Sequence, residues 1–290
     1  MAVRVGLIGA GPWASAVHAP GLARHPGTSL AAVWSRRPDA ASALATGTGA
    51  RVCDSVDELL ARCDAVAFAV PPDVQAELAV RAARAGRHLI LEKPLAADVD
   101  AAGRLADAAA GVTTVLVLTL RYWSRTRSWL DSLAAHDGWA GASLRWLSGA
   151  LLSGHSSPWR HEGGALADIG PHALDLLDAG IGEITSVLAA RHTTPDLWNL
   201  LLGHACGATS TATLSLSLPM RPTVLECAAY GRHGYRTVSG KPEDPAAAYA
   251  ALLDEFVEHV RAGKPEHPCD VRRGLHLQRI LAAAGQRAHR

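Results

Sequence analysis

The sequence has little lysine, phenylalanine or tyrosine and no excess of charge of either sign. Only Lys93, Lys241 and Lys264 are lysines among 28 basic residues, and there are two phenylalanines and four tyrosines. The formal net charge is +1. A chain this close to neutral does not bind a polyanion through bulk charge, which argues against a nucleic-acid partner. Because arginine is the usual basic residue here, a lysine is an unusual choice.

Long hydrophobic runs and paired cysteines are also missing. No stretch reaches the ~18 uncharged apolar residues of a membrane span, and the first residues enter a strand pattern without a charged segment and a cleavable hydrophobic region. We therefore expect a cytoplasmic protein with no membrane partner. The five cysteines are dispersed and form no C-x-x-C pair, so we expect reduced, mostly buried thiols.

A metal site is not expected either, because no histidine pair has the spacing of ligands on a helix. The histidines considered for this role are His155, His161, His192, His204 and His233.

The first part of the chain alternates apolar runs with helical spacing. The runs mostly lack polar alternation, which is typical of strands covered on both faces in a parallel α/β sheet. The expected strands are Val3–Ile8, Leu30–Ser35, Ala65–Val70, His88–Leu91 and Val112–Leu120, and the expected helices are Ala14–Arg24, Val56–Arg62, Val74–Ala85 and Val99–Ala109. Ser55 and Glu58 resemble a capping box at the start of the second helix. This pattern predicts a Rossmann domain with a doubly wound parallel sheet over residues 1–122.

The pattern changes after Arg121. Thr209–Leu218 has an apolar or small residue at every second position, which is typical of an antiparallel sheet with one open face. Residues 240–245 form a turn or loop before an expected helix over Ala246–Ala262. We therefore expect a second α/β domain, residues 123–290, with a mainly antiparallel open sheet for substrate binding and oligomerisation.

A glycine-rich turn follows the first strand and opens a helix. Gly9, Gly11 and Ala14 occupy the key positions of G-x-G-x-x-A, the dinucleotide-binding pattern, and Pro12 and Trp13 lie between them. The glycines permit a tight turn and close approach of a pyrophosphate, whose charge lies at the helix N-terminus. Pro12 fits the first helical turn, where a missing N–H is harmless.

The end of the second strand predicts which cofactor is bound. Ser35, Arg36 and Arg37 follow this strand, and no acid occurs until Asp39. An acid would accept a bond from a ribose 2′-hydroxyl, whereas a serine and arginines suit a 2′-phosphate. The sequence therefore favours NADP(H) over NAD(H). The alternative is that both arginines are solvated surface residues.

Two further motifs resemble the glucose-fructose oxidoreductase/inositol dehydrogenase (Gfo/Idh/MocA) family. The stretch from Val70-Pro71-Pro72-Asp73 to Glu92-Lys93-Pro94-Leu95 resembles its Glu-Lys-Pro region, and residues 163–175 resemble its D-x-G-x-H-x-x-D segment. The closing segment around Gly263-Lys264-Pro265 extends the resemblance over essentially the whole chain. The resemblance implies a nicotinamide-dependent oxidoreductase.

The residues of these motifs suit hydride transfer. Oxidation of an alcohol needs a base for the hydroxyl proton, and reduction needs the same group as an acid. We predict that His172 is this general acid/base and that Lys93 is a positive hydrogen-bond donor to the reacting oxygen. Asp168 is the expected orienting partner, on one helix face with His172 if the segment is helical. Alternatively, a lysine with a lowered pKa is itself the base. Asp168 also fits an N-cap, a role that does not exclude that of a catalytic partner.

Other assignments come from the resemblance. In the family, residues such as these border the cofactor or substrate: Val70, Pro71, Glu92 and Arg121 on the cofactor side, and Tyr122, Trp159 and Arg160 on the substrate side, with His172 contacting substrate. Asp175 fits a structural role as well as a substrate contact. Gln75 departs from the family, whose members often carry histidine there.

We thus expect a dehydrogenase or reductase acting on CH–OH or C=O of a sugar, cyclitol or sugar-like metabolite. The alternatives are reduction of a C=N bond in a specialised metabolite and a non-catalytic dinucleotide-sensing protein. If the resemblance holds, the open sheet face is available for a homodimer or homotetramer contact.

Overall fold

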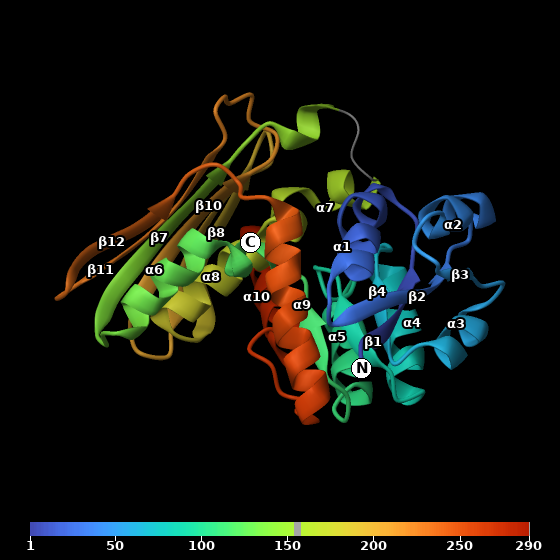
Figure 1. Ribbon diagram of the computed structural model, residues 1–290. Coiled ribbons are helices and arrows are strands. Elements are labelled where there is room, and N and C mark those ends of the chain that lie inside the picture. Colours follow the sequence, from blue (N-terminus) through green and yellow to red (C-terminus); the bar gives the residue numbers. More distant parts are fainter. Residues whose placement is uncertain (154–157, 290) are drawn as a thin grey trace. The chain divides into compact units, whose positions relative to one another are not determined.

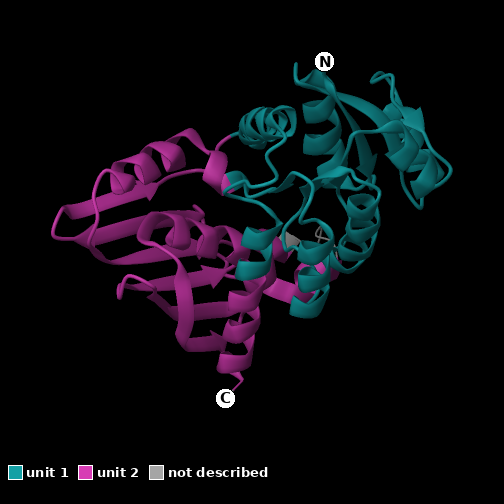
Figure 2. Ribbon diagram, turned by 90° about the horizontal axis from the view of Figure 1, so that it is seen from below, with its two compact units in different colours: residues 1–119, 244–276 teal, residues 120–243, 277–290 magenta. Residues whose placement is uncertain are grey.

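The computed structural model describes residues 1–153 and 158–289, which form two compact units (Figure 2). Unit 1 comprises residues 1–119 and 244–276, and unit 2 comprises residues 120–243 and those from 277 onward. The division near residue 120 lies close to the expected boundary. Residues 244–276, which we expected in the second domain, instead cluster with unit 1.

Unit 1 contains a parallel sheet of six strands (Figure 1). They are β1 (Val3–Ile8), β2 (Thr28–Trp34), β3 (Arg51–Val52), β4 (Ala65–Phe68), β5 (His88–Leu91) and β6 (Thr114–Leu116). Their order is β3-β2-β1-β4-β5-β6, the doubly wound arrangement of a Rossmann fold. Every residue of β4 and β6 is buried, as the apolar runs predict for strands covered on both faces.

Helices separate these strands along the chain. They are η1 (Ala14–His18), α1 (Ala19–Arg24), α2 (Pro38–Ala45), α3 (Val56–Arg62), α4 (Pro72–Arg84) and α5 (Val99–Ala108), and unit 1 also contains α9 (Pro245–Ala262), which follows the second sheet. The expected helix over residues 14–24 begins as the π-helical turn η1. At the start of α3 the hydroxyl of Ser55 accepts from the Glu58 N–H at 3.1 Å, which confirms Ser55 as the N-cap. The Glu58 carboxylate accepts from the Asp54 N–H at 3.0 Å, one residue before the Ser55 N–H that a capping box would use.

The last parallel strand is shorter than the sequence predicts. β6 ends at Leu116, and a 3₁₀ turn, η2 (Thr119–Tyr122), occupies residues expected in the strand. The Leu118 N–H donates to the Leu116 carbonyl at 2.7 Å, so the chain turns away from the ladder there. An apolar run alone does not reveal this local bond.

Unit 2 contains the second sheet. Its strands are β7 (Trp139–Leu147), β8 (Ile184–Thr193), β9 (Leu197–His204), β10 (Thr209–Ser215), β11 (Val224–Gly231) and β12 (Gly234–Ser239), in the order β12-β11-β7-β10-β9-β8. Only the β7–β10 pair is parallel among these described neighbours. The mainly antiparallel sheet is therefore confirmed. Most β8 residues are partly or fully exposed, as expected for an open face.

The helices of unit 2 carry the second group of candidate site residues. They are α6 (Ser124–Ala134), η3 (Ala150–Ser153), α7 (Pro158–Asp168) and α8 (Gly170–Ile181). One more helix, α10 (Val271–Ala288), has its first residues in unit 1 and the rest in unit 2.

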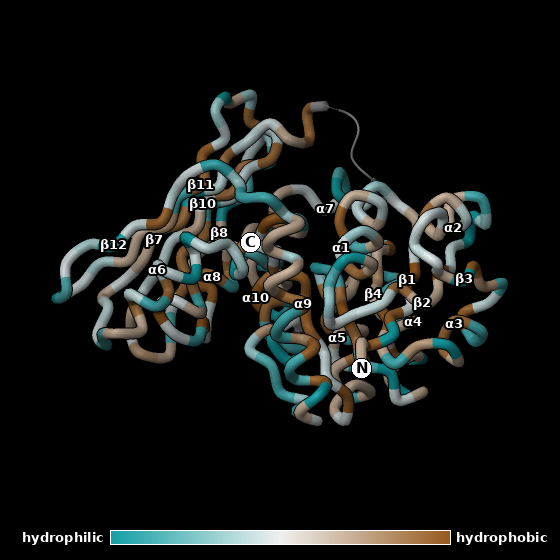
Figure 3. Tube along the Cα trace, viewed as in Figure 1, coloured by the Kyte–Doolittle hydropathy of each residue, from teal (hydrophilic) through white to brown (hydrophobic). Residues whose placement is uncertain are grey.

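The core residues agree with the hydropathy pattern, which can be followed along the chain in Figure 3. Phe68, Tyr249 and Phe256 are among the largest fully buried side chains, and all three belong to unit 1. All five cysteines are free thiols and four are buried, as expected. Among the described helices, none is long and apolar enough to cross a membrane.

Candidate active site

The two glycines of the turn after β1, Gly9 and Gly11, have different surroundings. Gly9 has φ +114°, and a Cβ there would lie 2.3 Å from the Ala69 carbonyl oxygen, so only glycine fits between the two strand ends. A Cβ on Gly11 would meet no atom within 4 Å. The turn is therefore tightly packed below Gly9 and open at Gly11, which suits the approach of a phosphate group to the backbone.

The residues after β2 lie against this turn. The Arg37 guanidinium donates to the Ala10 carbonyl at 3.1 Å, and the Arg37 backbone N–H donates to the Ser35 hydroxyl at 3.2 Å. Arg36 and Arg37 are both exposed. The structure thus brings Ser35 and the Arg37 guanidinium to the edge of the glycine turn.

Val70 and Pro71 join the end of β4 to α4. A Cβ built on Gly9 would lie 3.0 Å from a methyl of Val70, so this side chain borders the glycine turn. Pro71 is the N-cap residue of α4, and Pro72 occupies its first turn, where proline is well tolerated. Both predicted positions therefore lie at the carboxyl edge of the sheet.

Gln75 fastens the turn that follows β5. Its side-chain oxygen accepts from the Glu92 backbone N–H at 2.8 Å, and its amide nitrogen donates to the Glu92 carbonyl at 2.7 Å and the Leu95 carbonyl at 3.0 Å. Gln75 is fully buried. This side chain therefore holds the backbone on both sides of Lys93 and its cis peptide bond to Pro94.

The Glu92 carboxylate links the end of β5 to the helical turn that follows the glycine turn. One oxygen, Oε1, lies 2.7 Å from the Trp13 indole nitrogen and 2.9 Å from His18 Nε2. The other, Oε2, accepts from the Lys93 backbone N–H at 3.3 Å. Trp13 and Glu92, both predicted cofactor-binding residues, are thus linked directly.

His18 and Tyr249 extend this contact into the core. His18 Nδ1 lies 2.9 Å from the Tyr249 hydroxyl, and both residues are fully buried. Burial, followed by the nearby Glu92 charge, raises the pKa of Tyr249 well above its usual value, so the hydroxyl stays protonated. The sequence predicted a role for neither residue. His18 is one of 14 histidines, and Tyr249 lies 231 positions further along the chain, so no motif contains both.

Asp168 and His172 lie on two different helices, whereas we expected them on one helix. α7 ends at Asp168, α8 begins at Gly170, and Ile169 is the N-cap residue without a side-chain hydrogen bond. The helix breaks here because Pro171 is tolerated only in a first turn. The N-cap interpretation of Asp168 is therefore wrong as well. Its buried carboxylate instead accepts from Arg160 Nε at 2.8 Å.

The remaining candidates of unit 2 lie on α8, on α7 and at the start of the unit. His172 is 7% exposed, and its ring centroid lies 6.0 Å from that of Trp146 on β7. Arg121 binds Asp175 through two hydrogen bonds. Tyr122 is buried, whereas Trp159 is partly exposed in the first turn of α7.

A kink divides α7 at the glycine pair. Gly164 has φ 58° and ψ −156°, and the Asp196 carboxylate accepts from the Ala165 N–H at 2.8 Å. Asp196 lies between β8 and β9 and itself has φ 72°. This hairpin residue therefore fixes the helix that carries Arg160 and Asp168. No motif marks Asp196 in the sequence.

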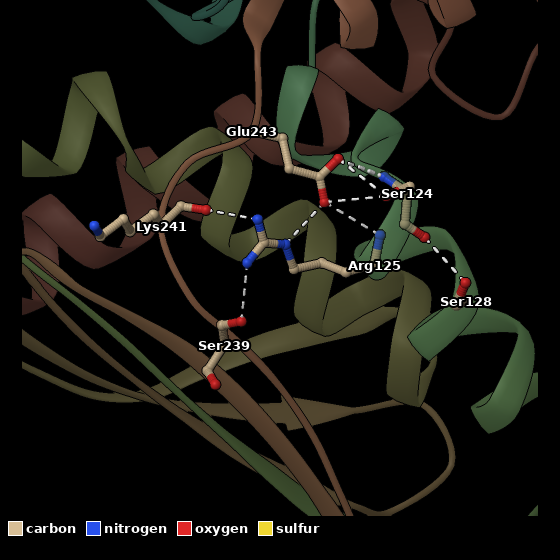
Figure 4. Close-up of polar contacts among 6 residues, drawn as sticks. All are labelled: Ser124, Arg125, Ser128, Ser239, Lys241 and Glu243. Atoms are coloured by element: carbon tan, nitrogen blue, oxygen red, sulfur yellow. Dashed lines mark hydrogen bonds and ion pairs between the residues drawn. The ribbon is translucent and has the colours of Figure 1, made fainter.

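A separate polar cluster closes the start of α6 (Figure 4). The Glu243 carboxylate accepts from the Ser124 N–H at 2.9 Å and from Arg125 Nε at 2.8 Å. Arg125 also donates to the Lys241 and Ser239 carbonyls at 2.7 and 3.2 Å. Desolvation raises the pKa of Glu243, but the bonds from Arg125 and Ser124 outweigh it and bring the pKa to about 2. In this cluster Lys241 accepts a hydrogen bond with its backbone carbonyl.

Within residues 1–153 and 158–289, no group of three or more His, Cys, Asp or Glu side chains is placed to hold a metal ion. His155, one of the histidines considered above, lies outside the described residues.

Comparison with known proteins adds three findings. Residues 3–119 match the model of an oxidoreductase family with an NAD-binding Rossmann fold. A dTDP-3,4-didehydro-2,6-dideoxy-α-D-glucose 3-reductase from Streptomyces violaceoruber is 32% identical over 208 residues, 67% of this chain and 59% of the reductase. Inositol 2-dehydrogenase from Rhizobium meliloti (strain 1021) is 41% identical over 103 residues, 35% of this chain and 30% of the dehydrogenase. The chain thus spans less than two thirds of either relative.

A solved structure extends the fold comparison to the whole chain. The WlbA dehydrogenase from Bordetella pertussis, in complex with NADH and UDP-GlcNAcA, matches with a TM-score of 0.87 and 24% identity, covering 100% of this chain and 97% of that chain. At this identity the likeness shows a shared fold.

Proposed function

Because the chain belongs to the Gfo/Idh/MocA oxidoreductase family, we propose that it is an NADP(H)-dependent dehydrogenase or reductase of a sugar, cyclitol or sugar-like metabolite. The glycine turn, with the Arg37 guanidinium fixed against Ala10, is the observation that carries the cofactor proposal. A bound nicotinamide cofactor would accept or donate the hydride. Every other part of the reaction depends on side chains of this chain.

The preference for NADP(H) rests on charge at the end of β2. Arg37 presents a cation beside the glycine turn, and Ser35 has a hydroxyl hydrogen that can bond a phosphate oxygen. Asp39, the first acid after the strand, is exposed in the first turn of α2. The opposing observation is that WlbA, the structural relative, is in complex with NADH.

Proton transfer is assigned to the residues of the two family motifs. His172 acts as the general acid/base, and Lys93 provides a positive donor to the reacting oxygen. Gln75 fixes the backbone of Lys93 on both sides. Asp168 is the partner that orients this set, and its bond to Arg160 keeps the carboxylate in place.

The names of two relatives and the side chains near α7 support the proposed substrate class. The two sequence relatives are named for a nucleotide-linked dideoxy sugar with carbonyl groups and for inositol, a cyclic polyol, and both compounds have a six-membered ring with oxygen substituents. Arg160 and Trp159 at the start of α7 offer a guanidinium and an aromatic surface, which suit hydroxyl or anionic groups and a sugar ring. Tyr122 completes the proposed substrate contacts.

The proposal is tested by measuring turnover in both directions. Oxidation is measured with a panel of sugars, cyclitols and nucleotide sugars, each with NADP⁺ and with NAD⁺. Reduction is measured with the corresponding ketones, each with NADPH and with NADH. We expect the Lys93→Ala and His172→Ala variants to lose at least about a hundredfold in kcat, the lower range for removal of acid–base catalysis. Full turnover by both variants would contradict the catalytic assignment. Turnover of imines but not ketones would favour the C=N reductase alternative.

A further inference from the structure

The Glu92 carboxylate is held by an indole N–H and a histidine ring. Its Oε1 receives the Trp13 indole N–H, and His18 Nε2 lies at 2.9 Å from the same oxygen. His18 Nδ1 lies 2.9 Å from the buried Tyr249 hydroxyl, so one ring nitrogen faces this hydroxyl and the other faces the carboxylate. These contacts orient the carboxylate of Glu92.

The surrounding core fixes this arrangement. Tyr249 packs edge-on against His18 with 4.9 Å between ring centroids, and a Cβ on Gly21 would lie 2.5 Å from the tyrosine ring. Gln75 holds the Glu92 backbone at the same time. The side chain of Glu92 is 13% exposed, so its charge acts through a medium less polar than water.

Strand order places Glu92 at one end of the proposed cofactor site. Ser35 and Arg37 follow β2, the glycine turn follows β1, Val70 follows β4 and Glu92 follows β5, in neighbouring positions of the sheet. A dinucleotide with its 2′-phosphate at β2 and its pyrophosphate at β1 has its nicotinamide end toward β4 and β5. The Trp13–Glu92 bond shows that the carboxylate reaches the helix that follows the glycine turn.

We propose that Glu92 stabilises the oxidised nicotinamide, which is positively charged, relative to the reduced ring, which is neutral. The inference rests on the proposed cofactor binding. A fixed carboxylate attracts a cation and has no comparable interaction with a neutral ring. Glu92 therefore determines which oxidation state of the cofactor the protein binds more tightly, while His18, Tyr249 and Gln75 are positioning residues for it.

The test measures dissociation constants by calorimetry for NADP⁺ and NADPH separately, and for NAD⁺ and NADH as a second pair. Glu92→Gln keeps an acceptor oxygen for Trp13 and His18 but removes the charge. We expect NADP⁺ to bind roughly tenfold more weakly, because a charge interaction of the size that shifts a pKa by about one unit changes an equilibrium constant about tenfold. The affinity for NADPH should stay within about threefold.

Three variants separate charge from position. Glu92→Asp keeps the charge, so the ratio of the two dissociation constants should stay near that of the wild type. Trp13→Phe removes a neutral donor, so it should weaken both oxidation states together. Glu77→Gln makes the same chemical change on an exposed position of α4 and should alter neither constant.

The outcomes distinguish this inference from the proposed function. If Glu92→Gln weakens both oxidation states equally or changes neither, the charge has no selective effect and the inference is overturned. If the wild type binds no nicotinamide nucleotide, the proposed function fails first. If a thermal melt shows that Glu92→Gln does not fold, Glu92→Ala replaces it, and an unchanged ratio in that variant is equally decisive.

Discussion

The Arg121 guanidinium donates two hydrogen bonds to the carboxylate of Asp175, from Nε to Oδ2 at 2.8 Å and from Nη2 to Oδ1 at 2.7 Å. The Asp175 side chain is 2% exposed and that of Arg121 is 19% exposed. Such a fork-shaped pair fixes both partners geometrically. It ties the start of unit 2, where Arg121 and Tyr122 lie, to the middle of α8.

Removal of one partner should therefore destabilise unit 2. We expect Asp175→Asn to lower the free energy of unfolding by about 2–4 kcal/mol, because the Arg121 charge loses its counter-ion in a poorly solvated place. Urea denaturation followed by circular dichroism measures this loss. Asp131→Asn, on an exposed position of α6, is the matched control. A loss below about 0.5 kcal/mol, the range of ordinary surface changes, would show that the pair contributes little.

Arg37 should select the cofactor. Arg37→Ala removes a charge-assisted bond to the proposed 2′-phosphate, so we expect NADPH to bind roughly ten- to a hundredfold more weakly, while NADH affinity stays within about threefold. Calorimetric titration with each nucleotide gives both constants. Arg24→Ala at the exposed end of α1 should change neither. An equal loss for both nucleotides would instead mean that Arg37 acts by bracing Ala10.

Gln75 should matter for both stability and turnover. Gln75→Leu leaves the N–H and carbonyl of Glu92 without these partners, which should cost about 1–3 kcal/mol for each buried group left unpaired. Because the same bonds hold the backbone beside Lys93, kcat should fall more than the affinity for 2′,5′-ADP, a fragment that carries only the adenosine end. The exposed Gln286→Leu serves as control. An unchanged kcat in a stably folded Gln75→Leu protein would remove the positioning role.

Glu243 should make stability depend on acid pH. The pKa of Glu243 in the folded protein is about 2, below the unfolded value of about 4.3. Its contribution is therefore complete above pH ~4.3 and is lost as pH falls toward about 2. We expect the Tm gap between wild type and Glu243→Gln to be widest near neutral pH and to shrink at pH 3. Glu266→Gln, an exposed glutamate, should show no such gap. A gap that is constant with pH would argue against the carboxylate as its source.

Local patterns predict the elements whose causes are local. β5 and α3 have the bounds expected from the sequence, because an apolar run between polar residues and a Ser55 cap define them without distant partners. α2 and α10 were not predicted. The hydrophobic spacing of α2 is weak over only eight residues, with a single buried side chain, Ala41.

The candidate site depends more on distant contacts. The glycine turn and the Glu-Lys-Pro turn could be found as motifs, since each is a short stretch of chain. The link from Trp13 through Glu92 and His18 to Tyr249 could not, because it joins three segments far apart in sequence. The helix break between Asp168 and His172 was foreseeable in part, because Pro171 marks a first turn, yet the Arg160 bond to Asp168 was not.

Because residues 244–276 belong to unit 1, the proposed nucleotide-binding domain cannot be transferred to another protein as one continuous segment. The family match ends at residue 119, but α9 supplies Tyr249 and Phe256 to the interior of that unit. A cloned fragment of residues 1–119 would uncover apolar surface and leave His18 without its hydroxyl partner. A transferable cassette therefore needs two pieces of chain joined by a new linker, with the 124 residues between them left out.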